Sequence, residues 1–229
     1  MSGIGREPSV TTRFANQLKR ACEKNKLIDI TFELAGQDNR ANADAIFSVL
    51  DNFLLIEFKS YKKGIKSEKY KSRVYNLCHN LLINERMTHY HRSCHFIMWG
   101  ASENHRLQTK YTIYQDSVCR KSFLVDSKVL DNPPLPTVLE GVSLADKISK
   151  SEVGLGLEDF LIYLKWLFSD NRSQNETFGG PISLIATSSS EYIDGLEFDS
   201  FNEFESWAKP TVTDLIEKLR NKPKNDFWG

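Results

Sequence analysis

The stretch ADAIFSVLDNFLLIEFKS, residues 43–60, contains two apolar segments that are separated only by Asp51 and Asn52. Both of these residues tolerate the left-handed backbone conformation that a two-residue hairpin turn requires. The stretch therefore predicts a β-hairpin with strands at 43–50 and 53–60. We expect helices to pack on the apolar face of this hairpin.

The hairpin also predicts where its charged residues lie. A turn at Asp51 and Asn52 places Asp44 opposite Lys59, and residues that are opposite or two positions apart share a face of the sheet. Asp44, Glu57 and Lys59 therefore converge on one face at one end of the hairpin. The other face receives an uninterrupted set of apolar side chains: Ala45, Phe47, Val49, Leu54, Ile56 and Phe58.

The rest of the first 130 residues contains further helical and strand-like patterns. Apolar residues at helical spacing predict helices at 12–25 and 67–82, and β-rich segments predict strands at 27–34, 95–100 and 111–114. A polar loop is expected at 36–42. This order of elements predicts an α/β fold with a mixed central sheet that is flanked by helices on both faces.

The proline-rich segment NPPLP at 132–136 separates two regions of opposite charge. Residues 1–130 contain 21 Lys and Arg against 13 Asp and Glu, a net charge of +8, whereas residues 131–229 contain 9 against 17, a net charge of −8. We expect a basic core at 1–131 and an acidic, mostly helical region at 132–229. The acidic region either extends the core or forms a subdomain that binds a partner protein.

Within the acidic region the pattern predicts helices at 157–168, 200–207 and 213–221 and a strand at 183–187.

The composition places the chain among soluble globular proteins, with 40% hydrophobic and 11% aromatic residues. No apolar run approaches the roughly 20 residues that a membrane-spanning helix needs. The first ten residues lack a basic stretch followed by an apolar one, so no secretory signal is expected. Four scattered cysteines favour reduced thiols in a cytoplasmic protein over a disulfide scaffold.

Two carboxylates and an ammonium group on one face of a largely apolar hairpin indicate a metal site. Charged side chains among hydrophobic residues are costly unless they are paired or bind a metal. Oxygen ligands suit Mg²⁺, which keeps several waters and leaves room for a substrate phosphate. Asp44 and Glu57 are therefore the candidate ligands of Mg²⁺, with Mn²⁺ as a substitute. The other reading is a buried group of ion pairs that holds no metal.

Asp44 at the start of one strand and Glu57-Phe58-Lys59 in the next resemble the motif of the PD-(D/E)xK nuclease superfamily, which has the restriction-endonuclease-like fold. The resemblance covers residues 12–115. Ala43 stands where the motif has a nominal proline, and no Gln-x-x-x-Tyr motif of the exonuclease branch follows.

The resemblance implies metal-assisted hydrolysis of phosphodiester bonds in nucleic acid. It implies that Asp44, Glu57 and the backbone carbonyl of Phe58 bind the metal, and that Lys59 either positions the attacking water or stabilises charge on the phosphate. DNA is the expected substrate, and RNA would be served equally well by the same residues. Restriction, anti-phage defence and mobile-element activity in microbes are the settings in which such proteins abound.

Many members of this superfamily add a glutamate from the first helix to the site. Glu23, at the end of the predicted first helix, and Glu33 are the candidates in this chain. The alternative function is a catalytically inactive subunit that keeps the fold, binds nucleic acid and recruits a partner through the acidic region. A homodimer is also compatible with the resemblance.

A basic stretch directly follows the predicted site and has three interleaved tyrosines. Its candidate nucleic-acid-binding residues are Lys62, Lys63, Lys66, Lys69, Lys71 and Arg73. Such a stretch can follow a phosphate backbone and make binding depend on salt. The other reading is an ordinary solvated helix face.

Cys78-His79 and Cys94-His95, with His89 and His91 between them, contain enough ligand atoms for zinc. Their spacing fits no common zinc finger. Core packing of the cysteines and surface exposure of the histidines are therefore expected.

Overall fold

The computed structural model describes residues 6–34, 43–71, 73–168, 184–188, 196–198 and 200–221, so the loop expected at 36–42 and Ser183 lie outside the described residues. The elements follow in this order: α1 (Arg6–Asn25), β1 (Asp29–Leu34), β2 (Ala45–Val49), β3 (Asn52–Lys59), the 3₁₀ helix η1 (Lys62–Tyr70), α3 (Val74–Ile83), α4 (Glu85–Cys94), β4 (His95–Glu103), β5 (Arg106–Ile113), α5 (Tyr114–Val118), β6 (Leu139–Glu140), α6 (Gly141–Ser149), α7 (Leu157–Phe168), β7 (Leu184–Ser188), β8 (Leu196–Phe198) and α8 (Phe201–Asn221).

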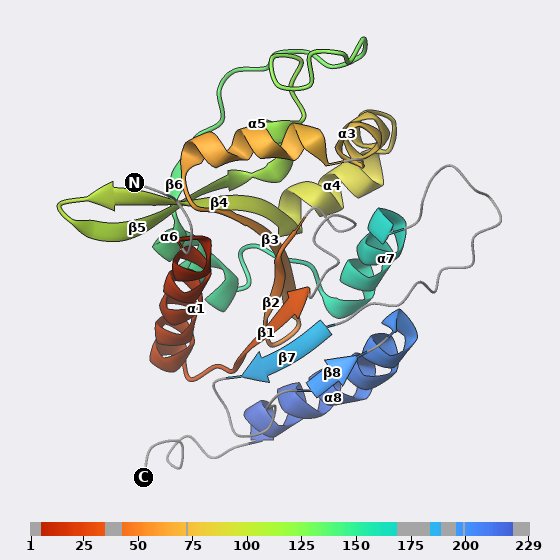
Figure 1. Cartoon of the computed structure of the whole chain (residues 1–229). Helices are drawn as coiled ribbons and strands as arrows, with labels where there is room; N and C mark the ends of the chain where they lie inside the picture. The colour runs from red at the N-terminus through yellow and green to blue at the C-terminus, as the bar shows by residue number, and fades with distance from the viewer. Residues whose placement is uncertain are drawn as a thin grey trace.

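The fold is α/β, with one mixed sheet between two layers of helices, as the sequence predicts (Figure 1). Its strand order is β6-β5-β4-β3-β2-β1-β7-β8. Among the described strands, β3 and β4 pair in parallel and the other neighbours pair antiparallel. A parallel pair needs a long crossover, and η1, α3 and α4 supply it.

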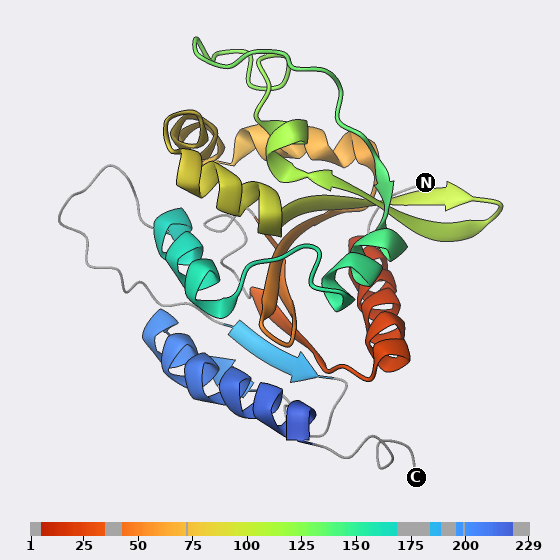
Figure 2. The ribbon, with the colours of Figure 1, turned by 180° about the vertical axis from the view of Figure 1, so that it is seen from behind.

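The sheet runs through both the basic and the acidic region of the chain. From beyond the proline-rich segment, β6 pairs with β5 and β7 pairs with β1. Figure 2 shows β7 and α8 beside the strands that the first region contributes. The acidic region therefore adds strands to the edges of the sheet that the basic region begins.

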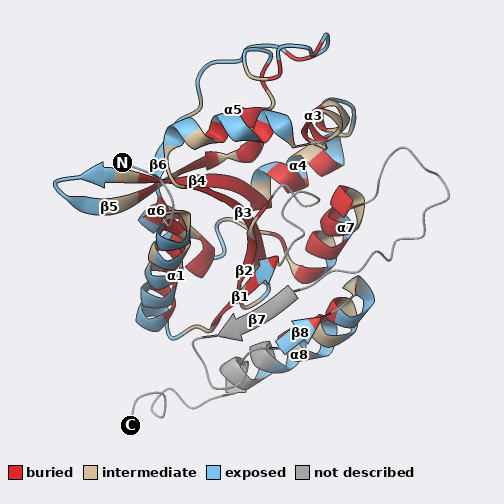
Figure 3. Ribbon diagram, in the orientation of Figure 1, coloured by how far each residue is buried: buried red, intermediate tan, exposed pale blue. Residues whose placement is uncertain are grey.

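Each face of the sheet has its own hydrophobic core. The first core lies under α1 and α6 and contains all six apolar residues that were predicted for one face of the hairpin, which confirms that prediction. In it, Phe14 of α1 packs edge-on against Phe47 with ring centroids 5.1 Å apart. Burial of each of these phenylalanine side chains contributes roughly 1.5–3 kcal/mol to the free energy of folding. The second core lies under α3, α4, α5, α7 and α8. Figure 3 shows that the central strands are buried on both sides.

The hairpin is present, but its turn lies one residue earlier than predicted. Val49 pairs with Asn52, so Leu50 and Asp51 form the turn, and Leu50 has a positive φ of 55°. The segment before α7 explains this shift. Leu155 exchanges two backbone hydrogen bonds with Phe53, and the Asp51 carboxylate accepts a hydrogen bond from Leu157 N at 2.9 Å. These contacts hold Asn52 and Phe53 in an extended conformation, so that Asn52 pairs with Val49.

The helix predicted at 67–82 is wrong in its first half. A 3₁₀ helix, η1, precedes it, and the α-helix begins only at Val74. The apolar residues at helical spacing that predict this helix are Tyr70, Val74, Leu77 and Leu81. The last three are buried, whereas Tyr70 is exposed. Among the unpredicted elements, α4 begins at an Asn84 side-chain cap that accepts a hydrogen bond from Met87 N.

The helices predicted at 200–207 and 213–221 form one helix, α8, with Pro210 inside it. Phe204, Ala208 and Val212 are buried at four-residue spacing on both sides of the proline. This continuous apolar stripe holds the helix against the sheet, and packing therefore overrides the break that proline favours. The prediction of a helix at 157–168 is confirmed by α7.

Cys78 of α3 and Cys119 are joined by a disulfide, so the expectation of four reduced thiols is wrong for this pair. Cys22 and Cys94 are free and buried. None of the described helices combines the length and the apolar composition that crossing a bilayer requires.

Candidate active site

The ends of β2 and β3 and the helix η1 position the predicted charged residues. β3 runs through the middle of the sheet, and Glu57 and Lys59 are among its last three residues. The Glu57 side chain is buried, with only 1% of the residue exposed. Asp44 directly precedes β2. Glu57 and Lys59 share a face because side chains alternate along a strand. The three residues lie together at this end of the hairpin, but their pairing differs from the prediction. Ala45 pairs with Ile56, so Asp44 lies opposite Glu57 and not opposite Lys59, because the turn lies one residue earlier.

Glu57 and Lys59 belong to a buried network of four charged side chains. The Lys59 ammonium group contacts Oε1 of Glu57 directly and lies 2.8 Å from Oε1 of Glu68. Lys71 Nζ lies 2.8 Å from Oε1 of Glu57 and 3.2 Å from Oε2 of Glu68. Tyr114 completes the network by donating a hydrogen bond of 2.7 Å to Oε2 of Glu68. Two glutamates thus face two lysines, and none of the four side chains is more than 11% exposed.

The network shifts the pKa values of its members in opposite directions. Burial raises the pKa of Glu57 to about 8, and the Asp44 carboxylate adds to this rise against the lowering effect of Lys71 and Lys59. Burial alone would lower the pKa of Lys59, but Glu57 and Glu68 outweigh it and raise that pKa above its ordinary value. Burial likewise opposes ionisation of Glu68, but Lys71 and Lys59 lower its pKa. Lys59 therefore stays protonated at neutral pH.

Asp44 faces the end of β3 from the neighbouring strand. Its Oδ2 accepts a hydrogen bond of 2.5 Å from the backbone N–H of Phe58. Burial raises the pKa of Asp44 to about 6, with a further rise from the carboxylate of Glu7. The backbone N–H of Phe58 and the two ammonium groups of Lys71 and Lys59 oppose this rise. Phe58 buries its side chain in the core under α1, and the metal contact expected of its carbonyl oxygen stays a prediction.

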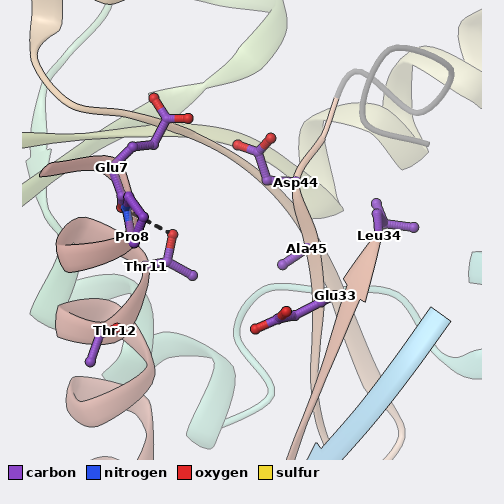
Figure 4. Close-up of a pocket in the computed structure, with 8 residues that line it drawn as sticks. All are labelled: Glu7, Pro8, Thr11, Thr12, Glu33, Leu34, Asp44 and Ala45. Atoms are coloured by element: carbon purple, nitrogen blue, oxygen red, sulfur yellow. Dashed lines mark hydrogen bonds between the residues drawn. The ribbon is translucent and has the colours of Figure 1, made fainter. Parts of the chain in front are cut away.

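A pocket of about 350 Å³ opens beside Asp44, between the start of α1 and the ends of β1 and β2 (Figure 4). It is lined by Glu7, Pro8, Thr11, Thr12, Glu33, Leu34, Asp44 and Ala45. In Figure 4 the carboxylates of Glu7 and Asp44 extend toward the same side of the pocket. This volume is near the lower end of the range for pockets that bind small molecules. A pocket of this size has room for a hydrated cation with a phosphate group.

The glutamate that α1 contributes to this region is Glu7, which the sequence reasoning missed. Glu23 is exposed near the other end of α1, about 24 Å away along a helix that rises 1.5 Å per residue. Glu33 does line the pocket, but it pairs with Ala45 and so lies on the α1 face of the sheet. A helix at 12–25 was expected, and the earlier start of α1 at Arg6 is what brings in Glu7.

The donor set at this site fits Mg²⁺. Among the described residues, no three His, Cys, Asp or Glu side chains are grouped closely enough to hold a metal by themselves. Mg²⁺, however, is commonly bound through one or two carboxylates, with waters and substrate phosphates completing its shell. Oε2 of Glu57 is buried and accepts no hydrogen bond from the described residues. Asp44 and Glu57 would therefore hold the ion, and its charge would favour their ionised forms.

The six basic residues predicted to bind nucleic acid divide into two groups. Lys62, Lys63, Lys66 and Lys69 are exposed on η1. Lys71 lies inside the charged network, and Arg73 donates a hydrogen bond of 3.4 Å to the backbone oxygen of Phe168 at the end of α7. These last two side chains are engaged within the protein and are not open phosphate contacts in this structure.

The histidines and cysteines considered for zinc lie in the second core. Cys78 is part of the disulfide. His91 and His95 are buried rather than exposed, and each contacts the hydroxyl group of Tyr163, at 2.7 and 2.8 Å. The expectation that the histidines lie at the surface is therefore wrong for this pair. The tyrosine explains their burial, because its hydroxyl satisfies a ring nitrogen of each.

Comparison of this chain with protein-family models, with curated proteins and with solved structures finds no match.

Proposed function

We propose that this protein is a metal-dependent nuclease that hydrolyses phosphodiester bonds of nucleic acid, with DNA as its substrate. The observation that carries the proposal is the convergence of Asp44, Glu57 and Lys59 at one end of the β2–β3 hairpin, beside an open pocket. The resemblance of these residues to the PD-(D/E)xK motif supports the same function. We further propose that the mixed sheet is of the restriction-endonuclease-like type.

Each of the three residues has a role that its environment supports. Asp44 and Glu57 would hold Mg²⁺, and Glu7 would add negative charge on the pocket side. Lys59 has a raised pKa and is held between Glu57 and Glu68, so it acts as a fixed positive charge and not as a base. It would neutralise charge that develops on the phosphate. When bound, the metal ion supplies an activated water molecule and polarises the phosphate.

The burial of this network favours catalysis over a purely structural role. Removing four charges from water is costly, and apolar residues of similar volume are often at least as stabilising. A chain that needed only stability at this position would therefore gain little from Glu57, Lys59, Glu68 and Lys71. The network acts on Asp44, which lines the acidic pocket, and perturbed ionisable groups of this kind gather where a cation and a phosphate bind.

A catalytically inactive subunit that binds nucleic acid is the second candidate function. The observation that favours it is the pairing of Glu57 with both Lys59 and Lys71, which neutralises the candidate ligand without a metal. In this case the acidic region recruits the active partner. Restriction, anti-phage defence or mobile-element activity is the setting that we propose for either function.

One experiment separates these two functions. The pure protein is incubated with plasmid, linear duplex, single-stranded DNA and RNA, with Mg²⁺ or Mn²⁺, and in parallel with EDTA. An Asp44→Asn variant, purified in the same way, controls for contaminating nucleases. Cleavage that requires the metal and is lost in the variant supports the nuclease. Binding without cleavage of any substrate supports the inactive subunit.

A further inference from the structure

The 3₁₀ helix η1 presents a row of three lysines to solvent. A 3₁₀ helix has three residues per turn, so side chains three positions apart lie directly above one another. Ile65 and Glu68 are buried and form the inner row. Lys63, Lys66 and Lys69 occupy the next row and are all exposed. At a rise of about 2.0 Å per residue, successive lysines in this row are about 6 Å apart along the helix.

The inner side of η1 holds this row in a defined place next to the candidate active site. Glu68 binds Lys59 at 2.8 Å and accepts the hydrogen bond from Tyr114. Near the other end of η1, the backbone of Gly64 lies against the aliphatic part of Lys59, where an added Cβ atom would be 3.5 Å from Lys59 Cβ. Both ends of η1 therefore contact Lys59, the residue that we assign to phosphate stabilisation, and this fixes the lysine row next to it.

Aromatic rings lie at both ends of the row. Tyr70 is 79% exposed, and the ammonium group of Lys69 lies 4.9 Å from the centre of its ring. At the other end, the cationic groups of Arg6 and Lys63 lie 4.1 and 5.7 Å from the ring centre of Tyr61. Cations that track a backbone and aromatic rings on which bases stack are the two components of sites for single strands.

We propose that η1 is a binding track for single-stranded nucleic acid, with the phosphates on Lys63, Lys66 and Lys69 and a base stacked on Tyr70. This inference rests on the proposed function, because it takes the adjacent site to act on phosphodiesters. A single strand fits better than a duplex because its base faces are open to stacking, whereas those of a duplex are covered. Lysine ammonium groups and a tyrosine ring read no base edges, so the track is indifferent to sequence.

The test measures binding in EDTA, so that cleavage does not interfere. Fluorescence anisotropy is recorded with a labelled single-stranded oligonucleotide and with the duplex of the same sequence, over a range of salt concentrations. The variants are Tyr70→Ala, Tyr70→Phe and a triple variant with Lys63, Lys66 and Lys69 changed to Gln. The matched control changes three exposed lysines elsewhere to Gln: Lys19, Lys24 and Lys128.

We expect the wild-type protein to bind the single strand more tightly than the duplex. Tyr70→Ala should lower the single-strand affinity about tenfold and leave the duplex affinity unchanged, and Tyr70→Phe should restore it. The triple variant should reduce the slope of log affinity against log salt by about 2, because each phosphate contact contributes about 0.7 for single strands. In the control variant, the slope of log affinity against log salt should differ from the wild-type slope by less than about 0.5.

Equal affinity for both forms, together with no effect of Tyr70→Ala, would overturn the track. The same proteins are then assayed for cleavage with Mg²⁺. Cleavage of a duplex by a protein that shows no single-strand preference refutes the track and leaves the nuclease intact. Single-strand binding that depends on Tyr70, without cleavage of any substrate, supports the track and refutes the nuclease.

Discussion

Lys71 Nζ lies 2.8 Å from Oε1 of Glu57, although the whole of η1 separates the two residues in the sequence. The same ammonium group reaches Glu68, which in turn contacts Lys59. The carboxylate of Glu57 is therefore held from two sides, by its own strand and by the segment that follows η1. Such a paired carboxylate is held in place before any ligand binds, which is the condition that a precise metal or phosphate site requires.

The first prediction concerns the three residues of the proposed site. Asp44→Asn, Glu57→Gln and Lys59→Met should each lower the single-turnover cleavage rate by about 100-fold or more, because each removes a charge that acts on the transition state. Circular dichroism verifies that each variant is folded. Lys24→Gln, a charge change at an exposed position of α1, serves as the control. Wild-type rates in all three variants would show that the site is elsewhere.

The second prediction separates the two ends of α1. Glu7→Gln should weaken Mn²⁺ binding about 10- to 100-fold, because the Glu7 carboxylate acts on Asp44 from the pocket side. Glu23→Gln should have no effect, since Glu23 is exposed near the far end of the helix. Isothermal titration calorimetry measures both affinities. Equal affinities in the two variants would remove Glu7 from the site.

The third prediction uses the raised pKa of Asp44, which is about 6 in the folded protein against an ordinary 3.8. Between these pH values the folded state keeps a proton that the unfolded state has released, so stability falls as the pH rises. Asp44→Asn removes this loss. In EDTA the variant should be more stable than the wild type at pH 8, by about 3 kcal/mol.

The difference between the two proteins should be much smaller near pH 4, where Asp44 is protonated in the folded wild type and about 40% protonated in the unfolded chain. Urea denaturation at pH 4 and pH 8 measures it. A difference that is the same at both pH values would mean that Asp44 does not titrate in this window.

The fourth prediction concerns Glu68, which is fully buried and contacts both lysines. Glu68→Gln leaves two ammonium groups with one carboxylate and should destabilise the fold by about 3 kcal/mol. Tyr114→Phe removes only one hydrogen bond from the network and should cost about 1 kcal/mol. Urea denaturation at pH 7 compares them. A smaller loss in Glu68→Gln than in Tyr114→Phe would mean that the lysines do not depend on Glu68.

The fifth prediction concerns a fragment of residues 1–130. Its charge of +8 favours tight binding to nucleic acid, but the fragment lacks elements that complete the fold. It loses β7, which pairs with β1, and α7, whose Phe160 stacks on Phe53 with ring centroids 5.1 Å apart. We therefore expect no cooperative thermal unfolding transition in the fragment. A two-state transition like that of the full chain would show that the acidic region is dispensable for folding.

Local patterns were sufficient for the elements whose residues face a single, continuous apolar surface. The alternation in 43–60 predicts the hairpin and its two faces, and the apolar run at 157–168 predicts α7 with correct bounds. The hairpin turn and η1 were predicted incorrectly. In both, a distant partner determines the conformation: Leu155 and Leu157 at the turn, and Lys59 at η1.

By itself the sequence determined that Asp44, Glu57 and Lys59 lie at one end of one hairpin, because strand alternation and a short turn act within a few residues. Only the tertiary structure brought in Glu7, Glu68 and Lys71. Their positions depend on where α1 begins and on the inward face of η1. The physical reason is that burying charges requires partners of opposite sign, and partners that are distant in the chain meet only when the helices have packed onto the sheet.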